Sequence, residues 1–281
     1  MDRQDIKSQE KQGKHIRKRI NDIYNELLRS FGSQGWWPTT PKGKTRPEYR
    51  GGPRSAKQRF EVIAGALLTQ NTSWKNVEKA LISLNKERLM DIHAIRNSRT
   101  SRLAALIRPA GYFNQKAERL KIAAACLDGR QLKKNSSLSR EELLAFKGIG
   151  PETADSILLY AFGKPSFVVD AYTRRIMSRA GICSPDCSYD ELQRIFHDNI
   201  PADGLSGAKA SPKRTVSRKK GSAPKNHATM SMDSKQADDD RAKIFNEYHA
   251  LLVELGKQYC TKNKPRCSSC PISRLCRKKN A

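Results

Sequence analysis

Apolar residues recur at helical spacing along most of this chain, and no segment alternates polar and apolar residues as a half-buried strand would. The helical pattern resumes after each of several glycines, at 111, 148 and 163. Because side chains alternate in direction along a strand but return to one face about every 3.6 residues along a helix, the two patterns are distinguishable. The sequence therefore predicts an all-α fold. The N-terminal part of the pattern comprises Ile16, Ile20, Ile23, Tyr24 and Leu27.

The charge of the chain indicates a polyanionic partner. Its 281 residues include 54 Lys and Arg against 28 Asp and Glu, so the formal net charge is +26. Such an excess favours nucleic acid first and an anionic membrane surface second. No apolar run approaches the length of a membrane span, and the charged N-terminus lacks the apolar core of a signal peptide. We therefore expect a cytoplasmic protein with no membrane partner.

Two segments interrupt the helical pattern. Residues 31–56 are rich in Gly and Pro and contain the adjacent Trp36 and Trp37, which indicates a loop anchored by aromatic side chains, with core packing as the plainer interpretation. Residues 203–240 are rich in Ser, Ala, Lys and Pro, with almost no large apolar residue, and are predicted to be a disordered basic insertion. That insertion is either a solvated connection between helices or an arm that contacts DNA phosphates.

Four cysteines lie close together near the end of the chain. Cys260, Cys267, Cys270 and Cys276 are separated by six, two and five residues. Short loops of this kind bring four sulfurs to one point, as a tetrahedral metal or a cubane cluster requires. Spacing alone does not choose between zinc and iron–sulfur. The other cysteines are expected to be small buried residues or spectators: Cys126, Cys183 and Cys187.

A glycine-rich turn separates two helical patterns at residues 143–160. We expect the first helix to end at Phe146, Gly148 and Gly150 to form a tight turn with positive φ, and Pro151 to begin the second helix. Exposed N–H groups at such a turn can bind a phosphate. The alternative is a purely structural corner between two helices.

An aspartate follows this turn further along the chain. Asp170 closes the apolar run Phe167-Val-Val and precedes another helical pattern. By itself, an Asp at this place is most often a helix N-cap. A functional role gains weight when the glycine turn and the cysteines are considered with it.

Taken together, the glycine turn, Asp170 and the cysteine spacing resemble the endonuclease III superfamily of helix-hairpin-helix DNA glycosylases. The resemblance extends from about residue 20 to residue 276, apart from the insertion. It implies two helical domains: a six-helix barrel at 57–164, with the helix-hairpin-helix at 143–160, and an iron–sulfur domain at 165–281. Residues 1–56 would supply an N-terminal helix and a Trp-containing loop that pack with the C-terminal domain.

The resemblance also assigns roles. Asp170 would be the catalytic carboxylate, and Gly148, Gly150 and Lys147 would bind the DNA backbone. The cysteine spacing is similar to that of the family's [4Fe-4S] loop, so Cys260, Cys267, Cys270 and Cys276 would hold that cofactor. Glu152 stands where bifunctional members carry a lysine that forms a Schiff base with the sugar. A carboxylate cannot do this, and Lys147 is expected to point elsewhere, so AP-lyase activity is not expected.

Three segments are similar to the 3-methyladenine glycosylase branch: 35–38, 59–78 and 161–175. The similarity places Gln70 where a side chain fills the gap left by an extruded base. It places Trp74 at the base pocket, where an aromatic face can stack on a cationic purine. Ordinary core packing is the plainer interpretation of Trp74.

The expected function is therefore that of a monofunctional base-excision-repair DNA glycosylase, a hydrolase of the N-glycosidic bond of alkylated purines. Its partner would be double-stranded DNA containing a damaged base, and the protein would act as a nucleoid-associated monomer. Three alternatives stay open. They are a bifunctional endonuclease III-type glycosylase and AP lyase for oxidised pyrimidines, a mismatch thymine or uracil glycosylase, and a non-catalytic DNA-binding relative.

Overall fold

The described part of the protein is helical. The computed structural model describes residues 3–130, 132–134, 138–201 and 234–277. Within these ranges the regular structure consists of helices, with one isolated antiparallel bridge between Thr39 and Glu48. The predicted all-α fold is confirmed.

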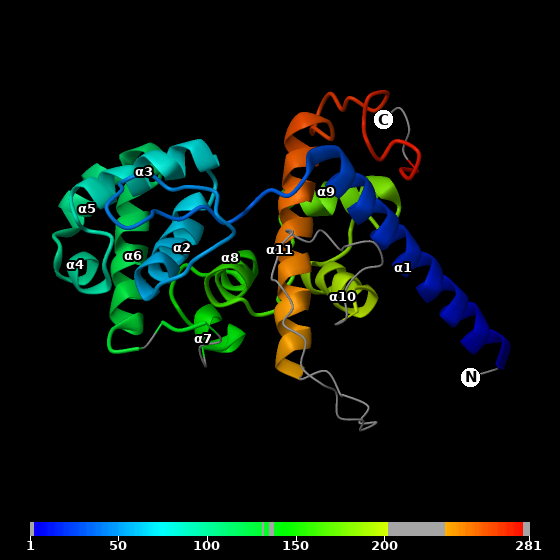
Figure 1. Ribbon diagram of the computed structural model, residues 1–281, viewed down its shortest axis with the longest axis horizontal. Coiled ribbons are helices and arrows are strands. Elements are labelled where there is room, and N and C mark those ends of the chain that lie inside the picture. The colour runs from blue at the N-terminus through cyan, green and yellow to red at the C-terminus, as the bar shows by residue number, and fades with distance from the viewer. Residues whose placement is uncertain (1–2, 131, 135–137, 202–233, 278–281) are drawn as a thin grey trace, which may run out of the picture.

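The helices form two groups that lie side by side (Figure 1). One group contains α1 (Arg3–Phe31), α9 (Ala171–Ala180), α10 (Tyr189–Asn199) and α11 (Ser234–Gln258). The other contains α2 (Ala56–Thr69), α3 (Trp74–Lys86), α4 (Ile92–Asn97), α5 (Thr100–Leu106), η1 (Arg108–Ala110), α6 (Phe113–Leu127), α7 (Arg140–Leu144), α8 (Pro151–Ser156) and the π-helical η2 (Ile157–Ala161). The first group thus combines the N-terminal helix α1 with the C-terminal helices α9, α10 and α11, and the helices between α1 and α9 form the second group.

The N-terminal helix α1 packs against α10 and α11 of the C-terminal half. Tyr24 lies edge-on to Tyr248 of α11, with ring centroids 5.2 Å apart. The Tyr248 hydroxyl donates to the Ile20 carbonyl at 2.9 Å. The Trp-containing loop behaves differently, because Trp37 packs directly on Gly65 of α2, where an added Cβ would lie 3.1 Å from the indole. The start of the loop also reaches α11, where the Gln34 N–H and the Ser33 hydroxyl donate to Glu247 at 2.7 and 2.8 Å, so the loop contacts both groups of helices.

Local sequence sets where several helices begin. Ser139 and Ser188 each form a capping box with the Glu three residues later, which satisfies free N–H groups at the starts of α7 and α10. At the other end of α9, Gly181 adopts the left-handed conformation with φ +70°. These signals are local, so they are readable from the sequence.

One expected boundary is wrong. The sequence predicts an insertion that ends at residue 240, whereas α11 begins at Ser234 because the last residues of that polar segment extend the helix. The rest of the expected insertion, residues 203–233, lies outside the described residues. Among the helices that are described, none combines the length and apolarity needed to cross a bilayer.

Candidate active site and DNA interface

The glycine turn joins α7 to α8 and is a tight hairpin. Gly148 has φ +89°, a conformation that favours glycine. Gly150 has φ −97°, so the expectation of positive φ at both glycines is wrong for Gly150, which is the extended N-cap of α8. Pro151 occupies the first turn of α8, as expected. The first helix ends at Leu144, two residues before the expected Phe146.

The two glycines differ in their surroundings as well. A Cβ on Gly148 would lie 2.4 Å from Nε of Arg119, so this glycine admits the Arg119 side chain beneath the hairpin. A Cβ on Gly150 would meet nothing within 4 Å. Gly150 and Lys147 are both exposed. The outer surface of the hairpin at Gly150 and Lys147 is therefore accessible to another molecule.

Gln70 is fastened to this hairpin. It follows the last residue of α2, and its Nε2 donates to the Gly148 carbonyl at 2.9 Å and to Thr153 Oγ1 at 3.0 Å. Its Oε1 accepts from Arg119 at 2.5 Å. In the protein alone, the residue expected to enter the DNA gap is thus held by two hydrogen bonds to the hairpin and one from Arg119 of α6.

A buried lysine fixes the backbone at the end of α2, where Gln70 lies. Lys116 is 1% exposed, and its Nζ donates to the carbonyls of Leu68, Gln70 and Ala110 at 2.7–2.9 Å. Burial, with a smaller effect of the nearby Arg119 charge, lowers the pKa of Lys116 to about 8. The carbonyls at the end of α2 are thereby satisfied inside the protein. Sequence reasoning missed this residue, since a Lys in an amphipathic helix is ordinarily solvated.

Asp170, the expected catalytic carboxylate, caps a helix in the structure. Its Oδ1 accepts the Thr173 backbone N–H at 2.7 Å, which makes it the N-cap of α9. Its side chain is 13% exposed. Burial acts to raise the pKa of Asp170, but the nearby imidazole of His249, together with Thr173, outweighs it and lowers the pKa. The carboxylate is therefore ionised at neutral pH.

Glu152 lies near Asp170. It stands in the first turn of α8 and has exposed surface, yet close surroundings desolvate its carboxyl group. That desolvation raises the pKa of Glu152, and the charge of Asp170 raises it further. The structure thus brings together two carboxyl groups that lie well apart in the sequence.

Two residues that sequence reasoning did not select complete this cluster. His249 of α11 is 8% exposed, and its Nε2 lies 3.6 Å from Asp170 Oδ2. Its Nδ1 lies 2.5 Å from the hydroxyl of Tyr160, in the π-helical segment η2. Both residues occupy helical positions that look like ordinary core, and His249 is distant from Asp170 in the sequence. No local motif could have indicated them.

Tyr160 also contacts a cluster of three tryptophans through Trp37. Trp37 is buried, with its ring centroid 5.0 Å from Tyr160 and 5.3 Å from Trp74. Trp74 is half-buried and lies edge-on to Trp36 at 4.9 Å. The indole nitrogen of Trp37 is buried and has no hydrogen-bond partner among the described residues. Trp74, expected at a base pocket, therefore belongs to an aromatic cluster that continues to Tyr160 and His249.

The loop carrying Trp36 and Trp37 is held by a buried glutamate. Glu61 of α2 is 1% exposed and accepts the backbone N–H of Thr40 at 2.9 Å and the Thr40 hydroxyl at 2.5 Å. Asn85 of α3 donates to the same carboxylate at 3.3 Å. Burial raises the pKa of Glu61 despite these hydrogen bonds. The tryptophans are thus attached to α2 and α3 through a polar contact as well as through packing.

The four clustered cysteines meet at one cavity. Cys260, Cys267, Cys270 and Cys276 all line it, together with apolar residues of α9 and α11. Arg179 lies beside them, with Nη1 3.4 Å from Cys260 Sγ, and burial raises the pKa of Cys270 to about 11. In the described ranges, no group of three or more His, Cys, Asp or Glu side chains is arranged closely enough to hold a single metal ion. The cavity thus gathers four sulfurs from one short segment without drawing them to a single point.

The remaining cysteines lie elsewhere. Cys183 and Cys187 have neighbouring thiols between α9 and α10, and burial raises the pKa of Cys183 to about 11. Cys126 is half-buried in α6. Of these three cysteines, expected to be small buried residues or spectators, only Cys187 is buried, and the other two are partly exposed.

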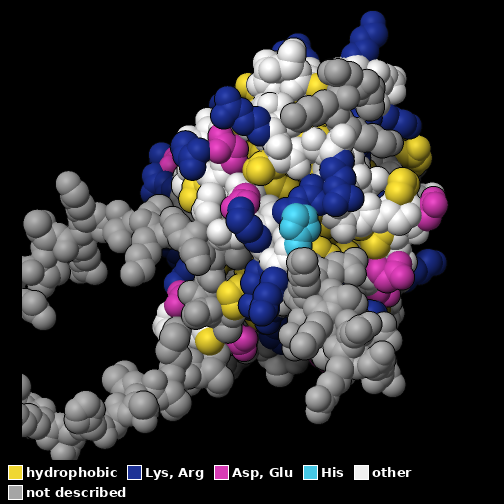
Figure 2. All heavy atoms as spheres, turned by 90° about the vertical axis from the view of Figure 1, so that its right-hand side faces the viewer, with side chains coloured by type: hydrophobic (Ala, Val, Ile, Leu, Met, Phe, Trp, Pro, Cys, Tyr) yellow, Lys and Arg dark blue, Asp and Glu magenta, His cyan; other side chains and the backbone are white. Residues whose placement is uncertain are grey.

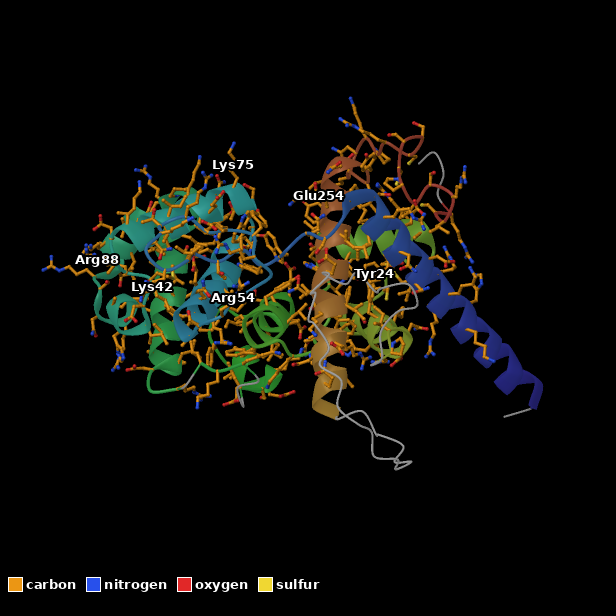
Figure 3. All side chains as sticks on the ribbon, viewed as in Figure 1. Tyr24, Lys42, Arg54, Lys75, Arg88 and Glu254 are labelled. Atoms are coloured by element: carbon orange, nitrogen blue, oxygen red, sulfur yellow. The ribbon has the colours of Figure 1, made fainter. Side chains whose placement is uncertain are left out.

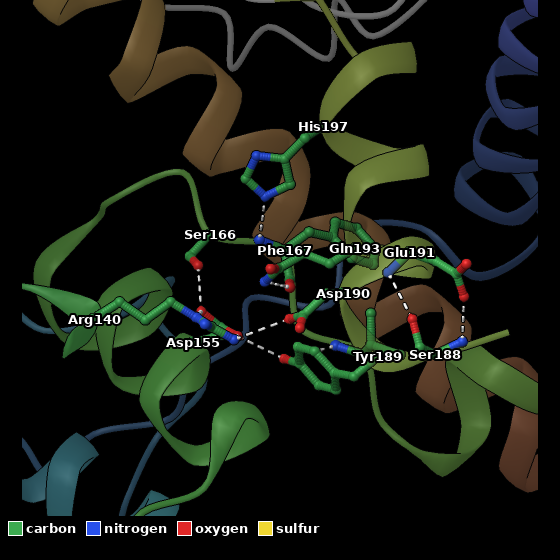
Figure 4. A network of polar contacts seen from close by, with 11 residues as sticks. Arg140, Asp155, Ser166, Phe167, Ser188, Tyr189, Asp190, Glu191, Gln193 and His197 are labelled. Atoms are coloured by element: carbon green, nitrogen blue, oxygen red, sulfur yellow. Dashed lines mark hydrogen bonds and ion pairs between the residues drawn. The ribbon is translucent and has the colours of Figure 1, made fainter. Parts of the chain in front are cut away.

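Another buried carboxylate, that of Asp155, connects the hairpin to α10 in the group of helices that contains α1 (Figure 4). Asp155 of α8 is fully buried and accepts from Arg140 Nε at 2.9 Å, Ser166 Oγ at 2.6 Å and Tyr189 OH at 2.7 Å. These partners come from α7, from the segment before Asp170, and from α10. Asp155 therefore fixes how the hairpin sits relative to the chain leading into Asp170.

Basic side chains are widely distributed on the surface. Figure 2 shows Lys and Arg side chains scattered over the side on which α1 and the C-terminal loop lie, with acidic ones between them. On the opposite half, Lys75 and Arg88 point outward from the ends of α3 (Figure 3). The positive charge is thus available to a polyanion on both halves of the molecule.

The fold and this hairpin define a class of DNA repair protein. Residues 64–202 match the family model described as "HhH-GPD superfamily base excision DNA repair protein". The chain is 38% identical over 265 residues, 92% of its length, to "Putative DNA repair glycosylase MJ1434" of Methanocaldococcus jannaschii, of which it covers 95%. The chain belongs to the HhH-GPD, endonuclease III-like superfamily.

Solved structures show the same fold. A Helicobacter pylori 3-methyladenine DNA glycosylase bound to 1,N6-ethenoadenine superposes with a TM-score of 0.61 and 29% identity, covering 88% of this chain and 97% of the other. A non-covalent endonuclease III–DNA complex gives a TM-score of 0.61 at 20% identity, covering 94% of this chain and 96% of the other. An endonuclease III of Sulfolobus acidocaldarius is 25% identical over 222 residues, which are 78% of this chain and 81% of that protein.

Proposed function

We propose that this protein is a monofunctional DNA glycosylase that removes alkylated purines from double-stranded DNA. The observation that carries the proposal is the pair of carboxyl groups at the site. Asp170 is ionised and close to Glu152, and no lysine stands at position 152. The Asp170 charge favours a cationic substrate, and the carboxyl group at position 152 provides no amine nucleophile there.

The chemistry follows from the substrate's charge. An N-alkylated purine is positively charged, so the electron pair of its bond to C1′ leaves readily with the base. As that bond breaks, positive charge develops on the sugar, and the Asp170 carboxylate stabilises it, as carboxylates do in glycoside hydrolysis. Water then adds at C1′ and its proton goes to Asp170 or to solvent. Extruding the nucleotide costs a few kcal/mol, less for a damaged base.

The aromatic cluster supports the choice of substrate. Trp36, Trp37 and Trp74 lie in contact beside Tyr160, which contacts His249 and thereby Asp170. An aromatic face attracts a cation more strongly than a neutral base. The likeness to the H. pylori 3-methyladenine glycosylase, at 29% identity, points the same way.

DNA would be bound by the hairpin and by basic side chains. The open surface at Gly150 and the start of α8 suits a phosphate, because free N–H groups and the helix dipole both favour an anion. The exposed Lys147 stands beside it. Gln70 would leave the hairpin and enter the gap when a nucleotide is extruded.

The cysteine cavity is proposed to hold a [4Fe-4S] cluster with a structural role. Its four sulfurs line one cavity, and cysteine thiolates are the ligands that such a cluster takes. The spacing of these cysteines, which is similar to that of the family's iron–sulfur loop, supports the same choice. When bound, such a cluster would fix the loop of residues 260–276 beside α9. Iron content and visible absorption of the purified protein test this, and stoichiometric zinc would contradict it.

The central experiment measures base release from duplexes containing methylated purines, with each reaction divided between hot alkali and no treatment. We expect free base, with strand breaks only after alkali. Breaks without alkali, or borohydride trapping, would show a lyase. Release only from oxidised pyrimidines or mismatched thymine or uracil would replace the substrate class.

A variant tests the role of Asp170. Asp170→Asn keeps the size of the side chain and an oxygen that can cap α9, but removes the charge. We expect base release to fall by at least about a hundredfold, as for loss of a principal electrostatic or acid–base group, with DNA binding retained. Unchanged activity would exclude Asp170 from catalysis, and loss of binding as well would point to a structural role.

A further inference from the structure

Asp170 is connected to a buried chain of two further side chains. Tyr160, His249 and Asp170 come from η2, α11 and α9, and α11 packs against both of the other elements. The Tyr160 hydroxyl lies 2.5 Å from His249 Nδ1, and His249 Nε2 lies 3.6 Å from Asp170 Oδ2. The three groups therefore form a chain of contacts that ends at the Asp170 carboxylate.

The direction of the hydrogen bonds in this chain follows from electrostatics. Burial, and the charges of Asp170 and Glu247, raise the pKa of Tyr160 well above its ordinary value, so the phenol keeps its proton. If Tyr160 donates to Nδ1, the proton of a neutral imidazole is on Nε2 and faces the carboxylate. The opposite tautomer would direct a lone pair at Asp170 and leave the phenol proton without this acceptor. The first arrangement is therefore favoured.

His249 also compensates an unfavourable neighbour. The groups that act on Asp170 are the carboxyl of Glu152 from α8, the phenol of Tyr160, the imidazole of His249 and the Thr173 N–H. Two nearby carboxylates in desolvated surroundings tend to share a proton. Thr173 engages only Oδ1, so the second oxygen faces His249 Nε2, a buried nitrogen with no hydrogen-bond partner of its own within the described residues.

From this geometry we infer that His249, oriented by Tyr160, is a positioning residue that keeps Asp170 ionised and directs its Oδ2 in the site. The inference rests on the proposed function for the catalytic role of Asp170. The N–H group acts through space in the free protein, since 3.6 Å is beyond a hydrogen bond.

The first test measures the titration of Asp170 directly. Carboxyl carbon NMR of selectively labelled protein follows Asp170 in the wild type, in His249→Phe and in Tyr160→Phe. We expect the apparent pKa of Asp170 to rise in His249→Phe, because burial and Glu152 are then opposed by Thr173 alone, and to rise less in Tyr160→Phe. An unchanged titration in folded His249→Phe would overturn the inference.

The second test measures single-turnover base release against pH, together with DNA affinity. His249→Phe is expected to slow release by at least about tenfold, the effect of losing one contact to a charged group. His249→Gln, which restores a neutral donor, should recover part of that loss. DNA affinity should change by less than about threefold, since affinity comes mainly from phosphate contacts. Equal rates in His249→Phe and the wild type would contradict the inference.

A matched control is present on α4. His93 Nδ1 lies 3.2 Å from Asp128 Oδ1, but this histidine side chain is 73% exposed. His93→Gln should leave the rate, its pH dependence and the Asp170 titration unchanged. Should the wild type release no methylated purine while the Asp170 titration still shifts in His249→Phe, the proposed substrate fails and the positioning role stands. Normal base release with an unshifted titration would instead support the proposed substrate and overturn the positioning role.

Discussion

The side-chain amide of Gln70 donates to the carbonyl of Gly148 at 2.9 Å, which couples the end of α2 to the centre of the hairpin. The same amide reaches Thr153 in α8, and Arg119 holds the other end of the side chain. Gln70 must break these bonds if it is to enter DNA. If Gln70 enters DNA as proposed, this coupling would make extrusion of a base sensitive to the hairpin.

Gln70→Ala tests this coupling. We expect single-turnover base release to fall by about tenfold, the cost of an unfilled gap and a lost side-chain hydrogen bond, while affinity for undamaged DNA changes little. Gln115→Ala, at an exposed position of α6, is the control and should match the wild type. An unaltered rate in Gln70→Ala would show that this side chain does not support the extruded state.

The two hairpin glycines should respond differently to alanine. Gly148→Ala forces a side chain into φ +89° and against Arg119, so we expect it to destabilise the protein by about 2–3 kcal/mol. Gly150→Ala faces open space and should change stability by less than about 0.5 kcal/mol. Its methyl group would nevertheless stand where a phosphate approaches, so DNA affinity should fall. Urea denaturation and DNA binding measure the two effects, and wild-type affinity in Gly150→Ala would argue against backbone contact there.

Asp155 is expected to be a principal stabilising contact between the hairpin and α10. Asp155→Asn removes the buried partner of Arg140 and should cost about 3 kcal/mol. Tyr189→Phe removes one hydrogen bond to the same carboxylate and should cost about 1–2 kcal/mol. Asp190→Asn is the matched control, because Asp190 lies 3.5 Å from Arg140 but is 71% exposed. Its loss should cost less than about 1 kcal/mol, and equal effects of the Asp155 and Asp190 variants would contradict this ranking.

His197 should make the fold sensitive to mild acid. Its Nε2 accepts the Phe167 N–H at 3.1 Å, and burial, aided by Arg241, lowers the pKa of His197 to about 4. The unfolded chain binds this proton near pH 6.5 and the folded chain only near 4. Stability is therefore lost as pH falls through that window, by up to about 1.4 kcal/mol per pH unit.

The measurement compares urea denaturation at pH 7 and pH 5 in the wild type and in His197→Gln. Carboxyl groups contribute equally to both proteins, so the difference between them isolates His197. We expect a smaller loss of stability at pH 5 in His197→Gln. An identical loss would mean that His197 binds its proton in the folded protein as readily as in the unfolded one.

Much of the fold could be predicted from the sequence, because helices and turns depend on residues that are close together in the chain. The recurrence of apolar residues at helical spacing predicted the helices. Pro151 predicted the start of α8, of which it is the first residue. Gly148 marked the hairpin because a positive φ there is a local requirement. The prediction of a positive φ at Gly150 was wrong. Gly150 is the extended N-cap of α8 with φ −97°, a backbone conformation that does not require glycine.

Only the tertiary structure decided the composition of the site. The sequence by itself determined that this is a basic, helical chain with a glycine hairpin, an aspartate after it and four clustered cysteines. It carried no sign that His249 and Tyr160 meet Asp170, or that Lys116 and Arg119 hold Gln70. The periodicity of apolar residues indicates which side of a helix is buried. The partner of a buried polar group depends instead on how helices from distant parts of the chain pack together. In this protein that packing joins Tyr160 to a histidine 89 positions further along the chain.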